Sequence, residues 1–266
     1  MNLAAYLRRI GFEAPAAPDP ETLRGIAARH PRAIAFENLE SWRGRPVSLA
    51  LADIEAKLVG AGRGGYCFEH NTLLLAALRE IGFDATPLAA RVEWMAAGAE
   101  PRPRTHMLIR VDIEGETWLA DAGFGGLTLT DALRLVPDIE QGADGDRMRL
   151  SREDGDWRLS AFVSGRFEPM YRFDMQPQVP ADQQMANYFV STHPQSQFVT
   201  DLIAARAADG GRYALRNRDL SFYPIGGPPQ RRHIESPEEL RATLAGECAI
   251  NLDTVDDLDM RMASLF

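Results

Sequence analysis

The stretch Arg63-Gly64-Gly65-Tyr66-Cys67-Phe68-Glu69-His70-Asn71 places a single cysteine where a glycine-rich turn leads into a helix. Residues 72–81, which follow, have the dense apolar spacing typical of a buried helix. Gly64 and Gly65 can adopt positive φ, so a sharp turn is expected there. Cys67 is then expected in the first helical turn, where unpaired N–H groups and the helix dipole favour a thiolate. The stretch therefore predicts a nucleophilic thiol.

Two predicted strands downstream bring a histidine near an aspartate. Residues 105–112 and 117–121 are rich in aliphatic side chains and are separated by a turn signal. An even-numbered loop puts His106 and Asp121 on the same face of this hairpin. They are diagonal neighbours if the turn is Glu114-Gly115, and they face each other directly if it starts one residue earlier. An odd-numbered loop would separate them onto opposite faces.

Cys67, His106 and Asp121 together form a candidate Cys–His–Asp set. A histidine can take the thiol proton or stabilise the thiolate, and a carboxylate can hold the imidazole in one tautomer and orientation. Such a set suits acyl transfer through a thioester, because a thiolate both attacks activated carbonyls and leaves readily. The three residues need only meet in one cleft.

With these residues in place, the chain closely resembles the arylamine N-acetyltransferases along nearly its whole length. In that family the triad runs Cys, His, Asp in this order, which implies Cys67, His106 and Asp121. Ala35 stands where the family often has proline, a change that concerns the loop and not the chemistry. The matching segments are Tyr6-Leu7-Arg8-Arg9-Ile10-Gly11, Ile34-Ala35-Phe36-Glu37-Asn38-Leu39, Lys57-Leu58-Val59, Arg63-Gly64-Gly65-Tyr66-Cys67-Phe68-Glu69, Ala90-Arg91-Val92, Thr105-His106, Leu119-Ala120-Asp121-Ala122-Gly123-Phe124-Gly125-Gly126, Ser191-Thr192-His193-Pro194 and Phe198.

The resemblance implies a ping-pong reaction. Cys67 takes the acetyl group from acetyl-coenzyme A, and an arylamine or hydrazine nitrogen then attacks the acetyl-cysteine while His106 receives the proton. Backbone N–H groups near a helix start suit the oxyanion, and the Cys67 amide is the first candidate donor, with Thr105 as a candidate second.

The resemblance also implies where the two substrates lie. Gly125 and Gly126 are expected near the pantetheine or pyrophosphate of the coenzyme, since glycines let the backbone approach a ligand closely. Phe124 is expected to line the acceptor pocket, with Phe36 and Phe198 as further members of an aromatic wall.

Simpler interpretations stand beside these. Cys67 is alternatively a buried apolar residue, and Asp121 a turn cap. His70, at i+3 from Cys67, is alternatively half of a metal site or the catalytic base, but no other residues with ligand spacing complete a metal set. It is therefore expected to be a polar group satisfied near the helix start. The phenylalanines are alternatively core residues.

Two other features are expected to be structural. Cys248 is predicted to be a packed residue. Arg63 and Glu37 are predicted to form an ion pair or to anchor turns rather than to take part in catalysis.

Composition narrows the function classes. The chain has 266 residues, 45% of them apolar, which is enough for a sizeable core. The net charge of −9 disfavours nucleic acid and anionic membranes as partners. No signal peptide and no apolar stretch long enough to span a membrane is evident. Two cysteines, one needed as a free thiol, predict a reducing cytoplasm. No metal is expected, and Lys57 is the only lysine.

The predicted fold class is α+β. Residues 1–86 are expected to form a helical domain that carries the nucleophile, residues 87–190 an antiparallel β-barrel that carries His106 and Asp121, and residues 191–266 an α/β lid domain. The family resemblance implies the same architecture, with a core like that of papain-like cysteine enzymes. Helices are expected at residues 2–10, 19–29, 48–60, 195–204 and 236–244, and strands at 89–94, 105–112, 117–121, 147–151, 156–163, 167–174 and around 211–222.

Other functions stay open from sequence alone. An amide synthase of the same family would use the same triad to join an arylamine to a polyketide-like acyl chain. A noncatalytic binding protein and a cysteine peptidase are further alternatives. The physiological amine, the preferred acyl donor and the oligomeric state, including a homodimer, are not determined by the sequence.

Overall fold

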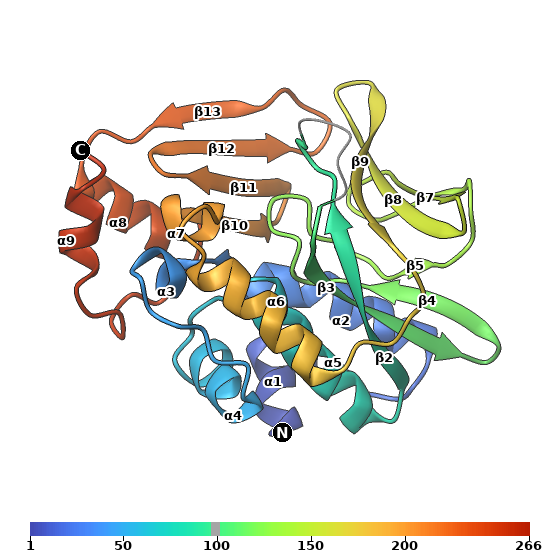
Figure 1. Ribbon diagram of the computed structural model, residues 1–266. Coiled ribbons are helices and arrows are strands. Elements are labelled where there is room, and N and C mark those ends of the chain that lie inside the picture. Colours follow the sequence, from blue (N-terminus) through green and yellow to red (C-terminus); the bar gives the residue numbers. More distant parts are fainter. Residues whose placement is uncertain (97–101) are drawn as a thin grey trace.

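The first third of the chain is helical, as its sequence predicts. The computed structural model describes residues 1–96 and 102–266 and is shown in Figure 1. Asp19 begins the second helix, because its side chain accepts a hydrogen bond from the Thr22 amide at 2.7 Å and Pro20 follows it. The helices of this part are α1 (Leu3–Arg9), α2 (Pro20–Ala33), α3 (Leu39–Trp42), α4 (Leu51–Ile54) with its π-helical continuation η1 (Glu55–Gly60), and α5 (Cys67–Ile81).

An eight-stranded antiparallel sheet forms the predicted barrel. Its strand order is β5-β4-β3-β2-β9-β8-β7-β6. The side chain of Gln141 joins the two edge strands, because it accepts from the Arg134 amide at 2.8 Å and donates to the Arg134 carbonyl at 2.9 Å. The sheet is therefore nearly closed, and the α+β class is confirmed. The strands are β2 (Asp84–Val92), β3 (Arg104–Ile113), β4 (Glu116–Ala120), β5 (Leu133–Arg134), β6 (Glu140–Gln141), β7 (Met148–Glu153), β8 (Asp156–Val163) and β9 (Arg166–Phe173).

The β3–β4 hairpin has the even-numbered loop that the site requires. Ile113 pairs with Glu116, so Glu114 and Gly115 form the turn, with φ of 50° and 84°. The hairpin register puts Asp121, one residue beyond β4, on the same face as His106 and diagonal to it. The first of the two predicted turn positions is confirmed.

A second, five-stranded sheet lies at the other end of the molecule. Its order is β1-β10-β11-β12-β13, and the last two helices pack against one end of it (Figure 1). β1 comes from the N-terminal helical part of the chain and pairs with β10, so the N-terminal and C-terminal parts both contribute strands to this sheet. The elements are β1 (Phe36–Glu37), β10 (Ile203–Ala208), β11 (Gly211–Arg216), β12 (Asp219–Pro224), β13 (Gln230–His233), α8 (Pro237–Ala245) and α9 (Leu258–Ala263).

The connection between the two sheets differs from the prediction. A helix, α6 (Pro180–Thr192), occupies the end of the region expected to be strands. Met185 and Tyr188 on this helix are exposed, so the apolar residues do not all lie on one buried face. The sequence therefore lacks the helical spacing of apolar residues by which a helix is recognised. The helix predicted at residues 195–204 is also wrong in extent. Only α7 (Gln197–Thr200) is helical, because the next residues pair with β1 and β11 as β10.

Strand β3 is buried on both faces, which places the site between two cores. Met107, Ile109 and Val111 belong to the core that contains Cys67 and the α5 side chains. Leu108, on the opposite face, belongs to the barrel core. His106 has the parity of Leu108 and therefore lies on the barrel face. The third core, beneath the second sheet, contains Cys248, so its predicted packing role is confirmed.

The glycines before Cys67 are required by close packing and not by positive φ. Neither Gly64 nor Gly65 has a positive φ, so the predicted reason for them is wrong. A Cβ on Gly64 would lie 2.1 Å from the Ala35 carbonyl oxygen, and one on Gly65 would lie 2.7 Å from a Glu69 carboxylate oxygen. Gly65 instead exchanges hydrogen bonds with the chain at β1, since its amide donates to Ala35 and its carbonyl accepts from Glu37.

Gly64→Ala is expected to destabilise the protein by about 1–3 kcal/mol, because backbone must move to admit the methyl group. Gly60→Ala is the matched control, since its Cβ would meet nothing closer than 3.8 Å, and we expect a change of about 0.5–1 kcal/mol or less. Urea denaturation of both variants measures the difference. Equal losses of stability would contradict the close-packing explanation.

Candidate active site

Cys67 is the first residue of α5. The preceding Tyr66 has extended backbone, and its amide donates to the Glu69 carboxylate at 3.1 Å, which closes the helix start. Cys67 lies in the first turn, where helical amides have no partner within the helix. Cys67 is only 4% exposed, and its sulfur lies 3.7 Å from the Thr105 carbonyl oxygen. The sequence placed this residue correctly.

A network of buried ion pairs supports this helix start. Lys57, the only lysine, contacts the Glu69 carboxylate at 2.7 Å and lies 4.0 Å from Glu37. Arg63 binds Glu37 at 2.7 Å, as the predicted structural ion pair, and reaches Glu40 at 3.2 Å. Burial raises the pKa of Glu37, but Lys57 and Arg63 outweigh it and lower the pKa overall. The network fixes the turn that carries Cys67.

A β-bulge aims His106 into the site. On β3, His106 pairs with Ala90 and Arg104 pairs with Arg91, so Thr105 is the extra residue. His106 is buried, and its Nε2 lies 2.7 Å from the Asp121 Oδ2. Because Nε2 is occupied by Asp121, Nδ1 is the nitrogen left for the Cys67 sulfur. The group of Thr105 that lies near the sulfur is its carbonyl oxygen. A carbonyl only accepts hydrogen bonds, so this group cannot be the second donor to an oxyanion.

Asp121 is held by more than the histidine. Its Oδ1 accepts from the Asn71 side chain and from the Gly123 amide, both at 2.9 Å. Asn71 in turn donates to the Met107 carbonyl at 2.6 Å and accepts from the Ala122 amide at 3.0 Å. Sequence reasoning missed Asn71, although its position at i+4 from Cys67 puts it on the same helix face. Asn71 thus ties the nucleophile helix to the carboxylate.

The surroundings of His106 favour the protonated form of its imidazole. Burial by itself lowers the pKa of His106, but the charge of Asp121, its hydrogen bond, and hydrogen bonding and charge interaction with Cys67 raise that pKa to about 10. Burial raises the pKa of Asp121, and interaction with His106, Asn71 and Gly123 lowers it overall. Both shifts favour an imidazolium beside an ionised carboxylate.

His70 plays a different part from either alternative considered for it. Its Nε2 donates to the Ala35 carbonyl at 3.0 Å, so its Nδ1 accepts from the His30 Nε2 at 2.9 Å. His30 Nδ1 then accepts from the Tyr6 hydroxyl at 2.8 Å. Burial lowers the pKa of His70 to about 4 and that of His30 far below its usual value. Both ring nitrogens of His70 are thus hydrogen-bonded within the protein. His70 is therefore available neither as a base for Cys67 nor as a metal ligand beside it.

At neutral pH we expect His106 to be an imidazolium and His70 a neutral Nε2–H tautomer, and ¹H–¹⁵N NMR of the ring nitrogens measures both. His106 should lose its charge only as the pH rises through about 10. Because this pKa lies above the unfolded value of about 6.5, its stabilising contribution is complete below about pH 6.5 and is lost as pH rises through about 10. A neutral His106 at neutral pH would contradict the charge assignment.

Aromatic side chains surround the imidazole. The ring of Phe124 lies 5.3 Å from the His106 ring in an edge-to-face arrangement, and the buried Tyr171 ring lies 5.0 Å away. Phe36 and Phe198 lie together, with ring centroids 5.9 Å apart. The structure thus puts Phe124 beside the site and pairs the other two predicted wall residues. Tyr171 was missed, since nothing local to its sequence marks it.

The glycine-rich loop after Asp121 packs tightly at Gly123 and less tightly at Gly125 and Gly126. A Cβ on Gly123 would lie 2.7 Å from the Cys67 Cα, so this glycine lets the loop touch the nucleophile. Gly125 has a φ of 88°, and a Cβ on Gly126 would meet nothing closer than 3.7 Å. Arg212 of β11 donates to the Gly126 carbonyl at 3.0 Å, which anchors the loop to the second sheet.

Residues 1–96 and 102–266 contain neither a cluster of metal ligands nor a helix suited to cross a membrane. No group of three or more His, Cys, Asp and Glu side chains there has the arrangement of metal ligands. No helix there has both the length and the apolar content to cross a bilayer.

Comparisons with known proteins show what this chain is similar to. A family model described as N-acetyltransferase matches residues 19–257. The arylamine N-acetyltransferase of Mycolicibacterium smegmatis is 41% identical over 246 residues, which cover 91% of this chain and 90% of that protein. The Escherichia coli K12 arylamine N-acetyltransferase is 38% identical over 266 residues, covering 97% and 94%. The solved structure of Mycobacterium marinum arylamine N-acetyltransferase in complex with CoA has a TM-score of 0.95 at 35% identity and covers 99% of both chains.

Proposed function

This chain belongs to the arylamine N-acetyltransferase family, and from that premise we propose that it acetylates arylamines and arylhydrazines through an acetyl-Cys67 thioester. One observation carries the proposal: His106, joined to Asp121 at 2.7 Å, is the strand neighbour of Thr105, whose carbonyl oxygen lies 3.7 Å from the Cys67 sulfur at the start of α5. The M. marinum relative was solved with CoA, which supports acetyl-coenzyme A as the donor.

In the first half-reaction the Cys67 thiolate attacks the carbonyl carbon of acetyl-coenzyme A. A new C–S bond forms, the bond to the coenzyme sulfur breaks, and the leaving thiolate takes the proton from the His106 imidazolium. His106 is then neutral and Cys67 carries the acetyl group. Asp121 keeps the imidazole oriented with Nδ1 toward the sulfur throughout.

In the second half-reaction the amine nitrogen attacks the acetyl-Cys67 carbonyl. The C–S bond breaks as the amide forms, the amine proton passes to His106, and Cys67 returns as a thiolate beside an imidazolium. The Cys67 amide, unpaired at the helix start, is the proposed donor to the tetrahedral oxyanion at both steps.

The substrate contacts are part of the same proposal. Gly125 and Gly126 are the proposed contacts of the pantetheine or pyrophosphate, because residues without a side chain let a ligand approach the backbone closely. Phe124 forms the acceptor wall next to His106, and Phe36 with Phe198 extends it, because flat aromatic rings suit an aromatic amine. Two free thiols fit a reducing compartment, so we place the enzyme in the cytoplasm.

Initial rates test the two-step scheme. With acetyl-coenzyme A and an arylamine varied together, double-reciprocal plots should give parallel lines, as a ping-pong reaction does. Intersecting lines would contradict it, because they indicate direct transfer within a ternary complex. Turnover only with long polyketide-like donors would instead identify an amide synthase, and no turnover with any donor would favour a binding protein.

A further inference from the structure

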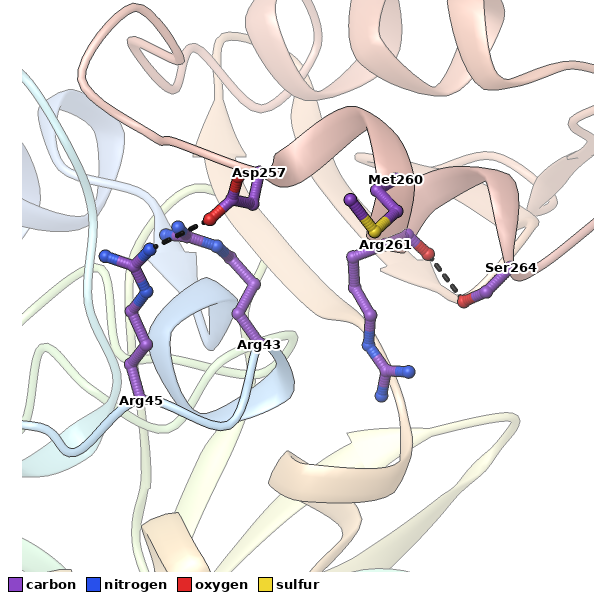
Figure 2. A pocket seen from close by; sticks show the side chains of 6 residues that line it. All are labelled: Arg43, Arg45, Asp257, Met260, Arg261 and Ser264. Carbon is purple, nitrogen blue, oxygen red and sulfur yellow. Dashed lines mark hydrogen bonds and ion pairs between the residues drawn. The ribbon is translucent and has the colours of Figure 1, made fainter.

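A cavity of about 350 Å³ is lined by residues outside the candidate active site (Figure 2). It is formed between the chain just after α3 and the last helix, α9, and none of its lining residues belongs to the candidate active site. Its size is at the lower end of the range typical of sites for small molecules. The lining residues are Arg43, Arg45, Asp257, Met260, Arg261 and Ser264.

The cavity concentrates positive charge in an acidic protein. Three of its lining residues are arginines and one is an aspartate, whereas the whole chain carries a net charge of −9. The acid outside the lining that is nearest to Arg43 is Glu40, at 3.6 Å, and it is shared with Arg63 at 3.2 Å. The carboxylates around these arginines therefore do not neutralise them.

Arg43 is the most informative of these residues. Its side chain is only 4% exposed, and among the residues that the structure describes, its Nε and Nη2 have no hydrogen-bond partner. These two nitrogens share one edge of the guanidinium, the edge that binds a carboxylate or phosphate through two parallel hydrogen bonds. Buried polar groups without a partner are uncommon and call for an explanation.

The surroundings of Arg43 favour an added anion. Burial lowers its pKa, and the neighbouring charges of Arg45 and Arg63 lower it further, against the opposing effect of Glu40 and Asp257. Figure 2 shows the ion pair between Arg45 and Asp257, which are 3.3 Å apart. An anion on the free edge of Arg43 would satisfy the buried nitrogens and offset the like charges.

The ion pair between Arg45 and Asp257 in the cavity lining is weak. Arg45 and Asp257 are 3.3 Å apart and both side chains are largely exposed, so their pairing contributes little in water. Arg261, by contrast, is held in place, because its Nε donates to the Trp42 carbonyl at 3.0 Å and its guanidinium lies over the Trp42 ring. A ligand can therefore displace the Arg45–Asp257 contact while Arg261 stays fixed.

We propose that this cavity binds a phosphate monoester through Arg43, Arg45 and Arg261. A phosphate dianion matches the surplus of arginines better than a single carboxylate does, and its oxygens fit the guanidinium edge. Met260 and the arginine stems provide apolar contact for an organic group attached to the phosphate. The inference concerns a site separate from the thioester chemistry and does not depend on it.

Isothermal titration with inorganic phosphate and with adenosine 5′-monophosphate, at constant ionic strength, tests the site. Arg45→Gln is expected to weaken binding of both by about tenfold, since it removes a charged hydrogen-bond donor. Asp257→Asn is expected to strengthen binding, because it removes the competing carboxylate. Tighter binding cannot result from misfolding, so this variant keeps the test decisive where Arg43 variants fold poorly.

Arg216→Gln is the matched control. Arg216 is also an exposed arginine in a single ion pair, with Asp201 at 2.7 Å, but it lies outside the cavity, and we expect its loss to leave binding unchanged. Tighter binding of the nucleotide than of phosphate would identify an organic phosphate as the ligand, and equal affinities would identify the phosphate group alone. The proposal is overturned if neither probe binds, or if Arg45→Gln and Arg216→Gln weaken binding equally.

Discussion

Replacing Cys67 with serine is expected to lower kcat/KM for arylamine acetylation by about 10⁴-fold or more. The site is tightly packed around Cys67. Serine still fits there, because its side chain has the same shape as that of cysteine and is slightly smaller. A hydroxyl, however, is far harder to ionise than a thiol and forms a poorer leaving group in the second half-reaction. Steady-state rates with acetyl-coenzyme A and an arylamine measure the loss.

Cys248→Ala is the control for this variant. Burial raises the pKa of the Cys248 thiol to about 12, and the residue lies in the core beneath the second sheet, so it remains an unreactive thiol. Its removal should leave the acetylation rate per folded molecule unchanged. Substantial activity in Cys67→Ser would exclude Cys67 as the nucleophile, and loss of activity in Cys248→Ala with the fold intact would contradict the purely structural role of Cys248.

Asp121→Asn is expected to have the second largest effect, a fall in kcat/KM of about 10³-fold. Asparagine keeps the shape and can keep contact with Gly123, but it removes the negative charge that raises the pKa of His106. The imidazolium and thiolate then lose their stabilising partner, and the amide can hold the wrong tautomer of His106. The rate and the ring ¹⁵N shifts of His106 should change together.

Asp112→Asn provides the comparison on the same hairpin. Asp112 pairs with Arg110 at 2.8 Å and accepts from Thr117, away from the imidazole, so its loss should leave the rate near that of the unchanged protein. If Asp121→Asn retained more than about a tenth of the activity, the carboxylate would not be the orienting group that we propose.

The pairing of His106 with Asp121 could be predicted because it depends on local rules. A two-residue turn and the alternation of side chains along a strand decide which residues share a face, and both can be read near Gly115. The start of α5 is local in the same sense, since a polar capping residue, Glu69, follows the turn at the spacing of a capping box.

What could not be predicted depends on contacts between distant segments. Gly64 is required by the carbonyl of Ala35, which immediately precedes β1, and no property of the turn itself shows this. The strand at Ile203–Ala208 exists because β1 and β11 flank it, although its sequence near Phe198 favours a helix. The chain from Tyr6 through His30 to His70 likewise joins three helices. His70 is a satisfied polar group near the helix start, as predicted, but its partners could not be inferred from its place beside Cys67.

The glycines after Asp121 show both situations in one motif. A Cβ on Gly123 would lie 2.7 Å from the Cys67 Cα, whereas one on Gly126 would make only ordinary van der Waals contact at 3.7 Å. The same sequence pattern thus contains one glycine that close packing requires and one that it does not. Only the three-dimensional contacts separate the two.

The most direct test of the central claim is the intact mass of the protein after incubation with acetyl-coenzyme A alone. The account predicts a single adduct of about 42 Da, the mass of one acetyl group, that is absent in Cys67→Ser and is removed when an arylamine is added. Full amine turnover with no adduct on the wild-type chain, or an adduct that persists in Cys67→Ser, would contradict a thioester on Cys67.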